Sequence, residues 1–301
     1  MINPDKKSWG ARLLISIPGL WLFLFFLAPF AMVVAISFSS PRVGMPPYDF
    51  LVVIKDEIVS ITINLENFLY IFSTNTYVSA AWTSIRIAAI STILTLLIAY
   101  PLAYGIAACH RRSRSFLVFL IIIPFWSSML IRVYSWMIIL RYENGLLNNF
   151  LMWLHIIDKP LVILNTDIAV YIGIVYTYLP FMVLPLYSTL SASDKTLIEA
   201  ARDLGCSKIV AFWRVTVPMS MPGVIAGCTL VFIPAIGEFV IPELLGGVNT
   251  NMIGRAIWFE FFNNRDWPQT AAITVVLLAI LIIPITATQL IRARQTKNGG
   301  K

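Results

Sequence analysis

The sequence predicts an all-α integral membrane protein with six transmembrane helices. Only 12% of its 301 residues are charged and the mean hydropathy is +0.81, which leaves too little polar surface to coat a soluble globule. Six apolar stretches are long enough to cross a bilayer, which takes roughly 20 residues each. They cover residues 13–38, 80–108, 116–140, 167–190, 219–241 and 269–291. We expect residues 1–301 to form a single transmembrane domain.

The first apolar stretch follows three basic residues, Lys6, Lys7 and Arg12, as the core of a signal peptide does. It is too long for a signal peptide and has no small-x-small cleavage site near its end. We therefore expect a permanent helix that is interrupted at Pro18-Gly19 and at Pro29.

The Lys and Arg residues predict the orientation. Most of the 22 precede the first span, follow the last one, or lie between spans two and three and between spans four and five. By the positive-inside rule these segments are cytoplasmic, and so are both termini. The net charge of +7 then reflects membrane topology, and no nucleic-acid partner is needed to explain it.

A charged loop, residues 191–218, separates spans four and five. Thr196 and the glutamate three residues later predict a capping box at the start of a short helix, which Gly205 ends. Ser207 is placed to cap a second short helix, and Pro218 opens span five. Both helices are amphipathic. From composition alone, such a pair either docks a soluble protein or lies at the lipid headgroups.

The loop resembles a known signature. Glu199-Ala200-Ala201, Gly205 and Val215-x-Val217-Pro218 are similar to the E-A-A-x3-G-x9-I-x-L-P segment of permease subunits of bacterial ABC importers, with Val in place of Ile and Leu. The resemblance implies the type I importer permease (MetI-like) fold in the cytoplasmic (inner) membrane. It also implies that the loop couples to an ATPase through Glu199, Ala200, Ala201, Asp203 and Gly205.

The same resemblance implies several partners: two ATP-binding subunits, a second homologous permease, and a periplasmic or extracellular binding protein. The chain has no G-x4-G-K-[ST] run to cradle phosphates, so we expect no enzymatic activity and no cofactor of its own. ATP and magnesium would be bound by the ATPase subunits. The three cysteines lack paired or metal-ligand spacing, so neither a disulfide nor a metal site is expected.

Four further strings resemble the permeases of spermidine/putrescine importers. The resemblance is strongest to the permeases of the putrescine type. They are PFWSSMLIRVYSWMIIL (124–140), YLPFMVLPLYSTL (178–190), FIPAIGEFVIPELLGG (232–247) and FFNNRDWP (261–268). The resemblance covers roughly residues 80–290, and it implies that the cargo is a polyamine.

A polyamine is a string of ammonium charges joined by methylenes. Its path should offer carboxylates for the charged ends and aromatic faces along the stem. Glu238 and Glu243 lie at the outer end of span five, beside a glycine and prolines that permit a broken helix. The other candidate path residues lie on spans three and four: Trp126, Arg132, Tyr134, Trp136, Tyr176 and Tyr178. No residue is predicted to be catalytic.

Structural roles stay open for these residues. Glu238 would alternatively form an ion pair with Arg132, and Glu243 would be a solvated loop charge. The aromatic residues are also typical interfacial anchors, and Arg86 is expected to snorkel to the outer interface. Glu260 and Asp266 place negative charge in the last outer loop, where a binding protein would dock.

Three other functions compete with the polyamine importer. A membrane-embedded enzyme would need a set of convergent catalytic groups, which the sequence does not show. An ion-coupled carrier acting alone would usually show an internal repeat, which this sequence does not show. Such a carrier would also have no use for a coupling signature. The third alternative keeps the importer mechanism and changes the cargo to another amine, an amino acid or iron.

Overall fold

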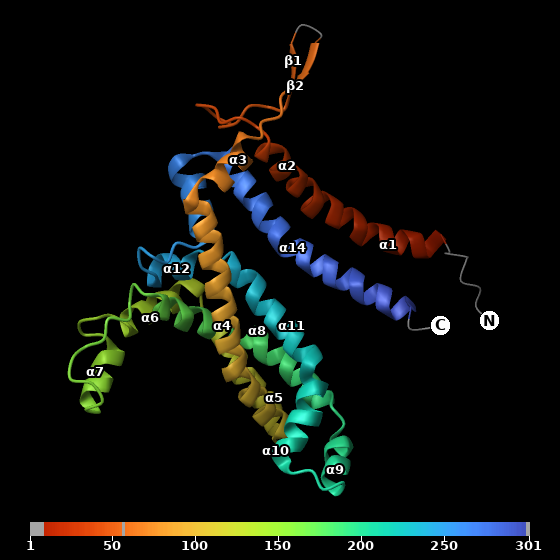
Figure 1. Ribbon diagram of the computed structural model, residues 1–301, viewed down its shortest axis with the longest axis vertical. Helices are drawn as coiled ribbons and strands as arrows, with labels where there is room; N and C mark the ends of the chain where they lie inside the picture. Colours follow the sequence, from red (N-terminus) through yellow and green to blue (C-terminus); the bar gives the residue numbers. More distant parts are fainter. Residues whose placement is uncertain (1–8, 56–57, 299–301) are drawn as a thin grey trace. The chain divides into compact units, whose positions relative to one another are not determined.

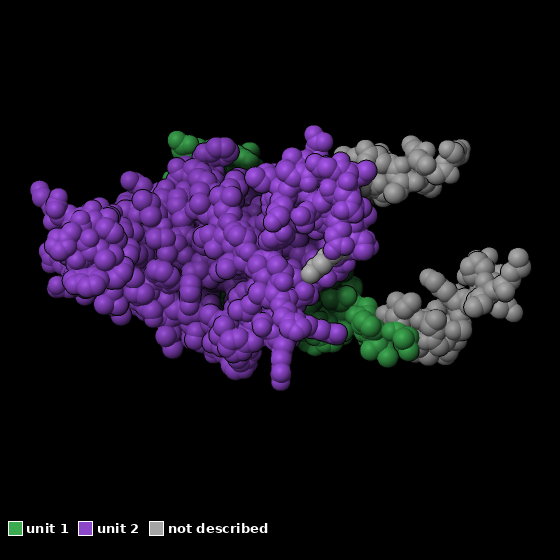
Figure 2. Space-filling view, turned by 90° about the horizontal axis from the view of Figure 1, so that it is seen from below, with its two compact units in different colours: residues 1–78, 257–301 green, residues 79–256 purple. Residues whose placement is uncertain are grey.

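A computed structural model describes residues 9–55 and 58–298. The chain divides into two compact units (Figure 2). Unit 1 comprises residues 1–78 and 257–301, and unit 2 comprises residues 79–256. The expectation of one domain over residues 1–301 stays a prediction.

Unit 2 is built from helices. Its elements, with those that continue into unit 1, are α4 (Asn75–Ala108), α5 (Arg111–Ile122), the 3-10 turn η2 (Ile123–Trp126), α6 (Met129–Ile139), α7 (Leu146–Trp153), α8 (Asp167–Ala192), α9 (Lys195–Asp203), α10 (Lys208–Ala211), the π turn η3 (Phe212–Thr216), α11 (Val217–Ile236), α12 (Val240–Leu245) and α13 (Ile253–Phe259) (Figure 1).

The centre of unit 2 is the packing of α8 against α11. Met182, Leu186 and Val231 are fully buried there. Gly223 and Gly227, one helical turn apart on α11, let the two backbones approach closely. A Cβ atom at Gly223 would lie 2.8 Å from the Pro185 carbonyl oxygen, and one at Gly227 would lie 3.2 Å from the Met182 carbonyl oxygen. Small residues at such positions allow the close van der Waals packing that holds membrane helices together. This packing matters because lipid is as apolar as the side chains, so burial from water does not drive the helices to associate.

The predicted third span is broken. The segments Arg111–Trp126 and Met129–Ile139 meet at an angle of 91°. Pro124 lies in η2 and has no amide hydrogen to continue the helix, and Ser127 is extended with φ −90° and ψ 150°. After the bend, α6 packs against α12, which also contacts α8.

Among the described residues, four helical segments are long and apolar enough to span a membrane: Ser16–Ser37, Asn75–Ala108, Asp167–Ala192 and Lys208–Ile236. The bent pair makes a fifth if it counts as one span, and the apolar part of α14, Trp267–Ile282, is shorter. This set is compatible with six spans, and the count of six stays a prediction. The all-α class is confirmed for the bulk of the described chain.

Unit 1 holds the first and last predicted spans. Its elements are α1 (Trp9–Leu22), the π turn η1 (Phe23–Leu27), α2 (Ala28–Ser37), β1 (Val52–Lys55), β2 (Ile58–Ile61), α3 (Glu66–Ser73), the π turn η4 (Glu260–Asn264) and α14 (Trp267–Asn298) (Figure 1). Within this unit, α14 packs along α2 and α3.

The expected interruptions of the first span do not occur. Pro18 lies inside α1, and Pro29 lies in the first turn of α2. The chain stays helical because the wider turn η1 precedes Pro29, with the Ala28 amide donating to the carbonyl of Phe23, five residues earlier. Such π turns commonly absorb an irregularity inside a long helix.

The segment 39–79, between the first two predicted spans, contains a small antiparallel hairpin. Val52 pairs with Ile61 and Lys55 with Ile58. The segment is fastened to the end of α2 by Asn67, whose side-chain amide donates to the carbonyls of Ser37 (3.0 Å) and Ser39 (2.9 Å). The loop therefore has structure that neither hydropathy nor periodicity indicates.

The close contact at Gly223 predicts a loss of stability in the Gly223→Ala variant. The added methyl group must push the Pro185 carbonyl away, which costs about 1–3 kcal/mol as overpacking does. Thermal unfolding of the purified chain in detergent measures the effect. Gly105→Ala is the matched control because a Cβ atom there meets nothing within 4 Å. Equal unfolding temperatures for the two variants would contradict the close packing.

Candidate functional site

The charged loop, residues 191–218, begins with an Asp cap. The Asp194 carboxylate accepts a hydrogen bond from the Thr196 amide (3.0 Å), and Asp194 is the N-cap of α9. Hydrogen bonds from the amide and side chain of Thr196 lower the pKa of Asp194. The predicted capping box at Thr196 and Glu199 is therefore wrong in register. Asp also caps helices well, and here it starts the helix two residues earlier than expected.

Gly205 ends α9 as predicted. Its φ of +90° is a backbone conformation that residues with a Cβ rarely adopt. Its amide donates to the carbonyl of Arg202 (2.9 Å), and the Cys206 amide donates to that of Ala201 (3.1 Å). These two bonds form a Schellman motif, which satisfies the last carbonyls of the helix and turns the chain sharply.

The second half of the loop differs from the expected separate short helix. Ser207 caps α10 through its hydroxyl, which accepts from the Val210 amide at 3.3 Å. The helix then continues through η3 into α11 without a break, from Lys208 to Ile236. Pro218 follows the wider turn η3, in which the Val217 amide donates to the carbonyl of Phe212, five residues earlier, so the helix continues past the proline. The loop is thus one short helix, α9, followed by an extension of the fifth span.

Phe212 of η3 anchors this extension to α4. Its ring meets those of Tyr100 and Tyr104 edge-on, at centroid distances of 5.8 and 5.6 Å. The Tyr100 hydroxyl also bonds the Ser220 hydroxyl at 2.9 Å. The base of the loop is therefore held firmly to the helices of unit 2.

The tip of the loop faces solvent. The five predicted coupling residues lie together on α9 and at its end; Glu199, Ala200, Asp203 and Gly205 are exposed and Ala201 is half-buried. Leu204 and Ile209 beside them are 87% and 73% exposed. An apolar surface of this kind, flanked by charges and by small residues, is typical of a site that another protein or a headgroup layer covers.

Glu238 sits at the corner between α11 and α12, and it is buried. Its Oε2 accepts a hydrogen bond from the Tyr178 hydroxyl at 2.5 Å. Its Oε1 accepts from the amides of Phe239 (3.1 Å) and Val240 (3.0 Å). The carboxylate thus satisfies the first amides of α12, which would otherwise be orphaned at membrane depth.

The alternative ion pair between Glu238 and Arg132 is not formed. The guanidinium of Arg132 lies 5.1 Å from the centroid of the Phe125 ring. Its Nε and Nη1 atoms are buried and have no hydrogen-bond acceptor among the described residues. Arg132 is therefore held by an aromatic face rather than by a carboxylate.

Aromatic rings connect these two charged groups. Phe125 meets Phe181 of α8 edge-on at 5.0 Å, and Phe181 lies 6.1 Å from the ring of Tyr178. Sequence reasoning missed Phe125 and Phe181, although both fall inside the strings that carry the family resemblance. Arg132 and Glu238 thus stand at the two ends of one aromatic cluster.

The other predicted path residues are placed differently. Trp136 and Tyr176 contact each other edge-on at 5.5 Å, which joins α6 to α8. Trp126 and Tyr134 are 77% and 46% exposed. Glu243 forms an ion pair with Arg255 at 2.6 Å, so it is not a free loop charge. The structure thus brings together two pairs of the predicted path residues, Tyr178 with Glu238 and Trp136 with Tyr176.

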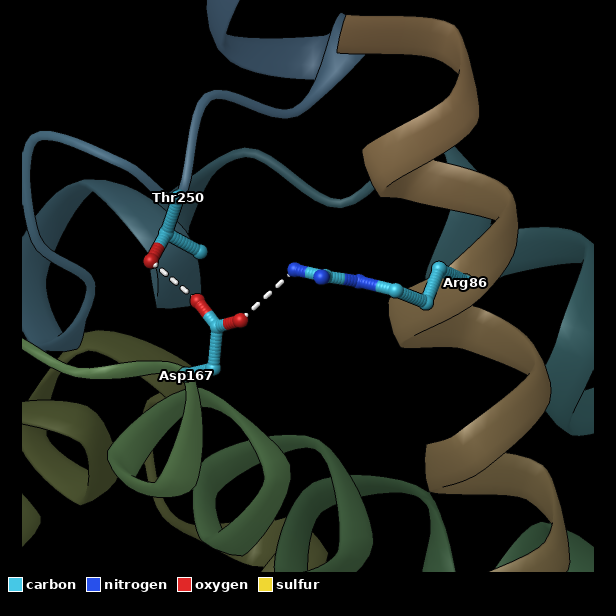
Figure 3. A network of polar contacts seen from close by, with 3 residues as sticks. All are labelled: Arg86, Asp167 and Thr250. Atoms are coloured by element: carbon cyan, nitrogen blue, oxygen red, sulfur yellow. Dashed lines mark hydrogen bonds and ion pairs between the residues drawn. The ribbon is translucent and has the colours of Figure 1, made fainter. Parts of the chain in front are cut away.

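Arg86 does not snorkel as expected. Its Nη2 lies 2.7 Å from Oδ2 of Asp167, whose Oδ1 accepts a hydrogen bond from the Thr250 hydroxyl at 2.6 Å (Figure 3). The Ile253 amide donates to the Ser84 hydroxyl at 2.8 Å. These contacts tie α4 and the start of α8 to the segment after α12. The sequence signal that could have indicated a structural role for Asp167 is its position as an acidic residue in the first turn of a helix.

In unit 1, the two acidic residues between α13 and α14 both have hydrogen-bond partners. Glu260 accepts hydrogen bonds from the Tyr77 hydroxyl and the Asn264 amide, each at 2.7 Å. Asp266 caps α14 by accepting from the Gln269 amide at 2.9 Å. Burial raises the pKa of Asp266, and the bond from Gln269 opposes this shift. Both carboxylates therefore have structural partners within the unit.

The hydrogen bond from Tyr178 to Glu238 predicts a stability loss in the Tyr178→Phe variant. Removing the hydroxyl leaves a buried carboxylate oxygen without its donor, which costs about 1–3 kcal/mol. Thermal unfolding in detergent is the measurement. Tyr134→Phe serves as the control because Tyr134 is 46% exposed. An unchanged Tyr178→Phe protein would show that water or another donor replaces the hydroxyl.

Comparison with known proteins identifies the family. The model of the binding-protein-dependent transport system inner membrane component matches residues 99–296. The spermidine/putrescine transport system permease proteins PotB of Haemophilus influenzae and Escherichia coli are 41% and 40% identical to this chain. The alignments cover 90% and 89% of this chain and 91% and 92% of those proteins.

A solved structure shares the fold. In the bacterial alginate ABC transporter in complex with a pentasaccharide-bound periplasmic protein, one chain superposes with a TM-score of 0.70 at 14% identity. The match covers 97% of this chain and 96% of that one. The MetI-like permease fold predicted from the coupling signature is thereby confirmed. The chain belongs to the family of inner membrane components of binding-protein-dependent ABC transport systems.

Proposed function

We propose that the chain is the permease subunit of an ATP-driven importer that moves polyamines, putrescine or spermidine, into the cytoplasm. The observation that carries this proposal is the identity of about 40% with two PotB spermidine/putrescine permeases across nine tenths of the chain. As a member of this permease family the chain is a transport subunit, not an enzyme. It is a multi-pass protein of the inner membrane.

The proposed orientation places both termini and the loop 191–218 in the cytoplasm. The positive charges of Arg111, Arg112 and Arg114 and those of the loop support this assignment. In this orientation α9 faces the compartment that supplies ATP. The outer loops, with Glu260 and Asp266, face a periplasmic or extracellular binding protein. A periplasmic protein of that kind is present in the complex of the similar alginate transporter.

The proposed assembly contains two ATP-binding subunits, which hold ATP and magnesium, and a second homologous permease. In this assembly α9 docks on one ATPase subunit through its exposed small residues. α9 joins α8 on one side through Asp194, and on the other through Gly205 and Ser207 it joins the continuous helix that includes α11. Because α8 and α11 pack closely, a displacement of α9 moves both helices. Alternating access follows when ATP binding and hydrolysis drive that displacement.

The proposed path for the polyamine runs past the corner at Glu238. Oε2 of Glu238 accepts a hydrogen bond only from Tyr178 among the described residues, so one lone pair remains for an ammonium group. The rings of Tyr178, Trp136 and Tyr176 provide aromatic faces for the methylene stem and the second ammonium. Trp126, Tyr134 and Glu243 remain candidates nearer the surface.

Arg132 has the opposite sign to the cargo. Its guanidinium rests on Phe125 without a carboxylate partner, so it repels a cation that enters the aromatic cluster. We assign to it the role of a barrier to leakage of cations in the resting state. Another amine, an amino acid or iron as the cargo, with the same importer mechanism, is the second candidate function.

The coupling role predicts that Gly205→Asp uncouples the importer. The φ of +90° strains any side chain at this position, and the turn that presents α9 changes. Binding-protein-stimulated ATP hydrolysis in proteoliposomes should fall at least about tenfold, equivalent to 1.4 kcal/mol. Co-purification of the subunits shows whether the complex still assembles. Full stimulated hydrolysis in an assembled variant would rule out the coupling role of this turn.

The substrate role predicts that Glu238→Gln lowers uptake of labelled putrescine or spermidine. Glutamine has the same shape: its carbonyl still accepts from the amides of α12, while its amide group donates to the Tyr178 oxygen. Loss of the charge alone should then reduce uptake at low concentration about tenfold. Glu66→Gln, an exposed carboxylate in the first turn of α3, is the matched control. Normal uptake by Glu238→Gln would leave Glu238 with only its capping role.

A further inference from the structure

A groove lined by two arginines lies in unit 1. Its volume is about 620 Å³. One wall is the loop between α2 and β1, and the other is the turn that joins η4 to α14. Its described lining contains no carboxylate. The lining residues that matter below are Arg42, Val43 and Met45 on the loop, and Phe262, Arg265 and Trp267 on the turn.

Both walls of the groove are held by contacts inside the unit. At the base of the loop, the Arg42 amide donates to the carbonyl of Pro47 at 3.3 Å. The ring of Tyr48 lies 6.2 Å from that of Trp267, and Trp267 stacks on Phe261 at 5.2 Å. The loop is therefore presented in a fixed conformation. Such preorganisation lowers the entropy that is lost when a partner binds.

The tip of the loop carries apolar side chains that the unit does not cover. Val43 and Met45 are 104% and 84% exposed, and Phe262 across the groove is 53% exposed. Single exposed apolar residues are common on protein surfaces, but these three line one groove between fixed walls. Apolar side chains gathered in this way are typical of a surface that another molecule covers.

The two arginines give the groove a positive lining. Arg265 is exposed and forms no ion pair among the described residues. Arg42 lies 4.0 Å from the carboxylate of Asp49, and both of these side chains are more than half exposed, so their pairing is weak. An acidic partner surface would therefore find two guanidinium groups available for charge-assisted hydrogen bonds.

The backbone of Arg265 also indicates a functional position. Its φ is +53°, in the left-handed region, directly after the π turn η4. This conformation is costly for most residues that carry a Cβ, although asparagine adopts it readily. Strained residues of this kind cluster at functional sites, as π turns do. An arginine kept here at such a cost suggests that its side chain is used.

The carboxylates of this region are engaged elsewhere. Glu260 accepts hydrogen bonds from Tyr77 and Asn264, and Asp266 caps α14. The sequence pointed to these two acids as the place where a binding protein docks. The charged groups that line the groove are arginines instead.

We propose that this groove docks the binding protein of the importer, through an acidic surface around an apolar contact with Val43 and Met45. The inference rests on the proposed function, in whose orientation the end of α2 and the start of α14 lie on the outer side. The family is described as binding-protein-dependent, so its members need a surface for that protein. Arginine is enriched where proteins meet, and opposite charges speed their encounter.

The test measures the association of the two proteins directly. The assembled importer is held in phosphatidylcholine nanodiscs, and the binding protein that stimulates its ATP hydrolysis is titrated by surface plasmon resonance at low and high salt. The variant with Arg42→Gln and Arg265→Asn should bind about tenfold more weakly, mainly through a slower on-rate and with less dependence on salt. Asparagine suits the left-handed conformation, so this change removes the charge and preserves the turn.

Lys159→Gln is the matched control. Lys159 is exposed, lies on the outer side in the proposed orientation and is not part of the groove. Binding by this control should stay within about twofold of the native protein, as for a surface charge outside the contact. Val43→Ser keeps every charge and changes a fully exposed side chain. It should raise the off-rate about threefold, and it keeps the test decisive if the double variant does not assemble.

Three results would overturn the proposal. Equal affinity of the native protein, the double variant and Val43→Ser would show that the binding protein docks elsewhere. Equal weakening by Lys159→Gln and by Arg42→Gln would indicate diffuse attraction to any positive charge. Unchanged protein binding with a loss of bound phosphatidylglycerol from the double variant, counted by native mass spectrometry, would assign the groove to lipid headgroups. A native assembly that associates with no binding protein would contradict the proposed function itself.

Discussion

The hydrogen bonds of the Glu238 carboxylate hold together the part of unit 2 where the membrane helices are irregular. α11 stops at Ile236 and α12 restarts at Val240, so backbone amides are left without helical partners at a depth where no water replaces them. One carboxylate accepts from these amides and from the Tyr178 hydroxyl on α8. The break in the span is thereby fixed to α8. That same break gives the protein a buried charge beside aromatic rings.

The two ends of unit 2 are built in opposite ways. Beyond α12, the ion pairs of Arg86 with Asp167 and of Glu243 with Arg255 fasten the connecting segments to the helices. At the other end, α9 and its turn at Gly205 project an apolar and charged surface with few internal contacts. The proposed coupling to an ATPase requires such a surface. In that proposal the continuous helix from Lys208 to Ile236 carries a displacement of α9 back toward Glu238.

The sequence predicted what depends on local chemistry. Apolar length located most of the long helices, and the glycine in the charged loop indicated the exposed turn at Gly205. The partners of buried charges were not predictable, because they depend on which helices meet. Arg86 is expected from the sequence to snorkel, yet it pairs with Asp167 at the start of α8, far away in the sequence. The alternative ion pair of Glu238 with Arg132 rested on charge alone, and the structure does not form it. Hydropathy also did not predict the bend after Pro124 or the hairpin formed by β1 and β2, because both depend on contacts between segments and not on local apolarity.

The central claim is that ATP hydrolysis by a partner drives polyamine import through this chain. The most direct measurement is ATP hydrolysis by the reconstituted assembly with its binding protein, in the presence of putrescine, spermidine, ornithine, arginine or ferric ion. The account predicts stimulation by putrescine or spermidine and no stimulation by the other three. Stimulation by a different member of the panel, with none by either polyamine, would contradict it.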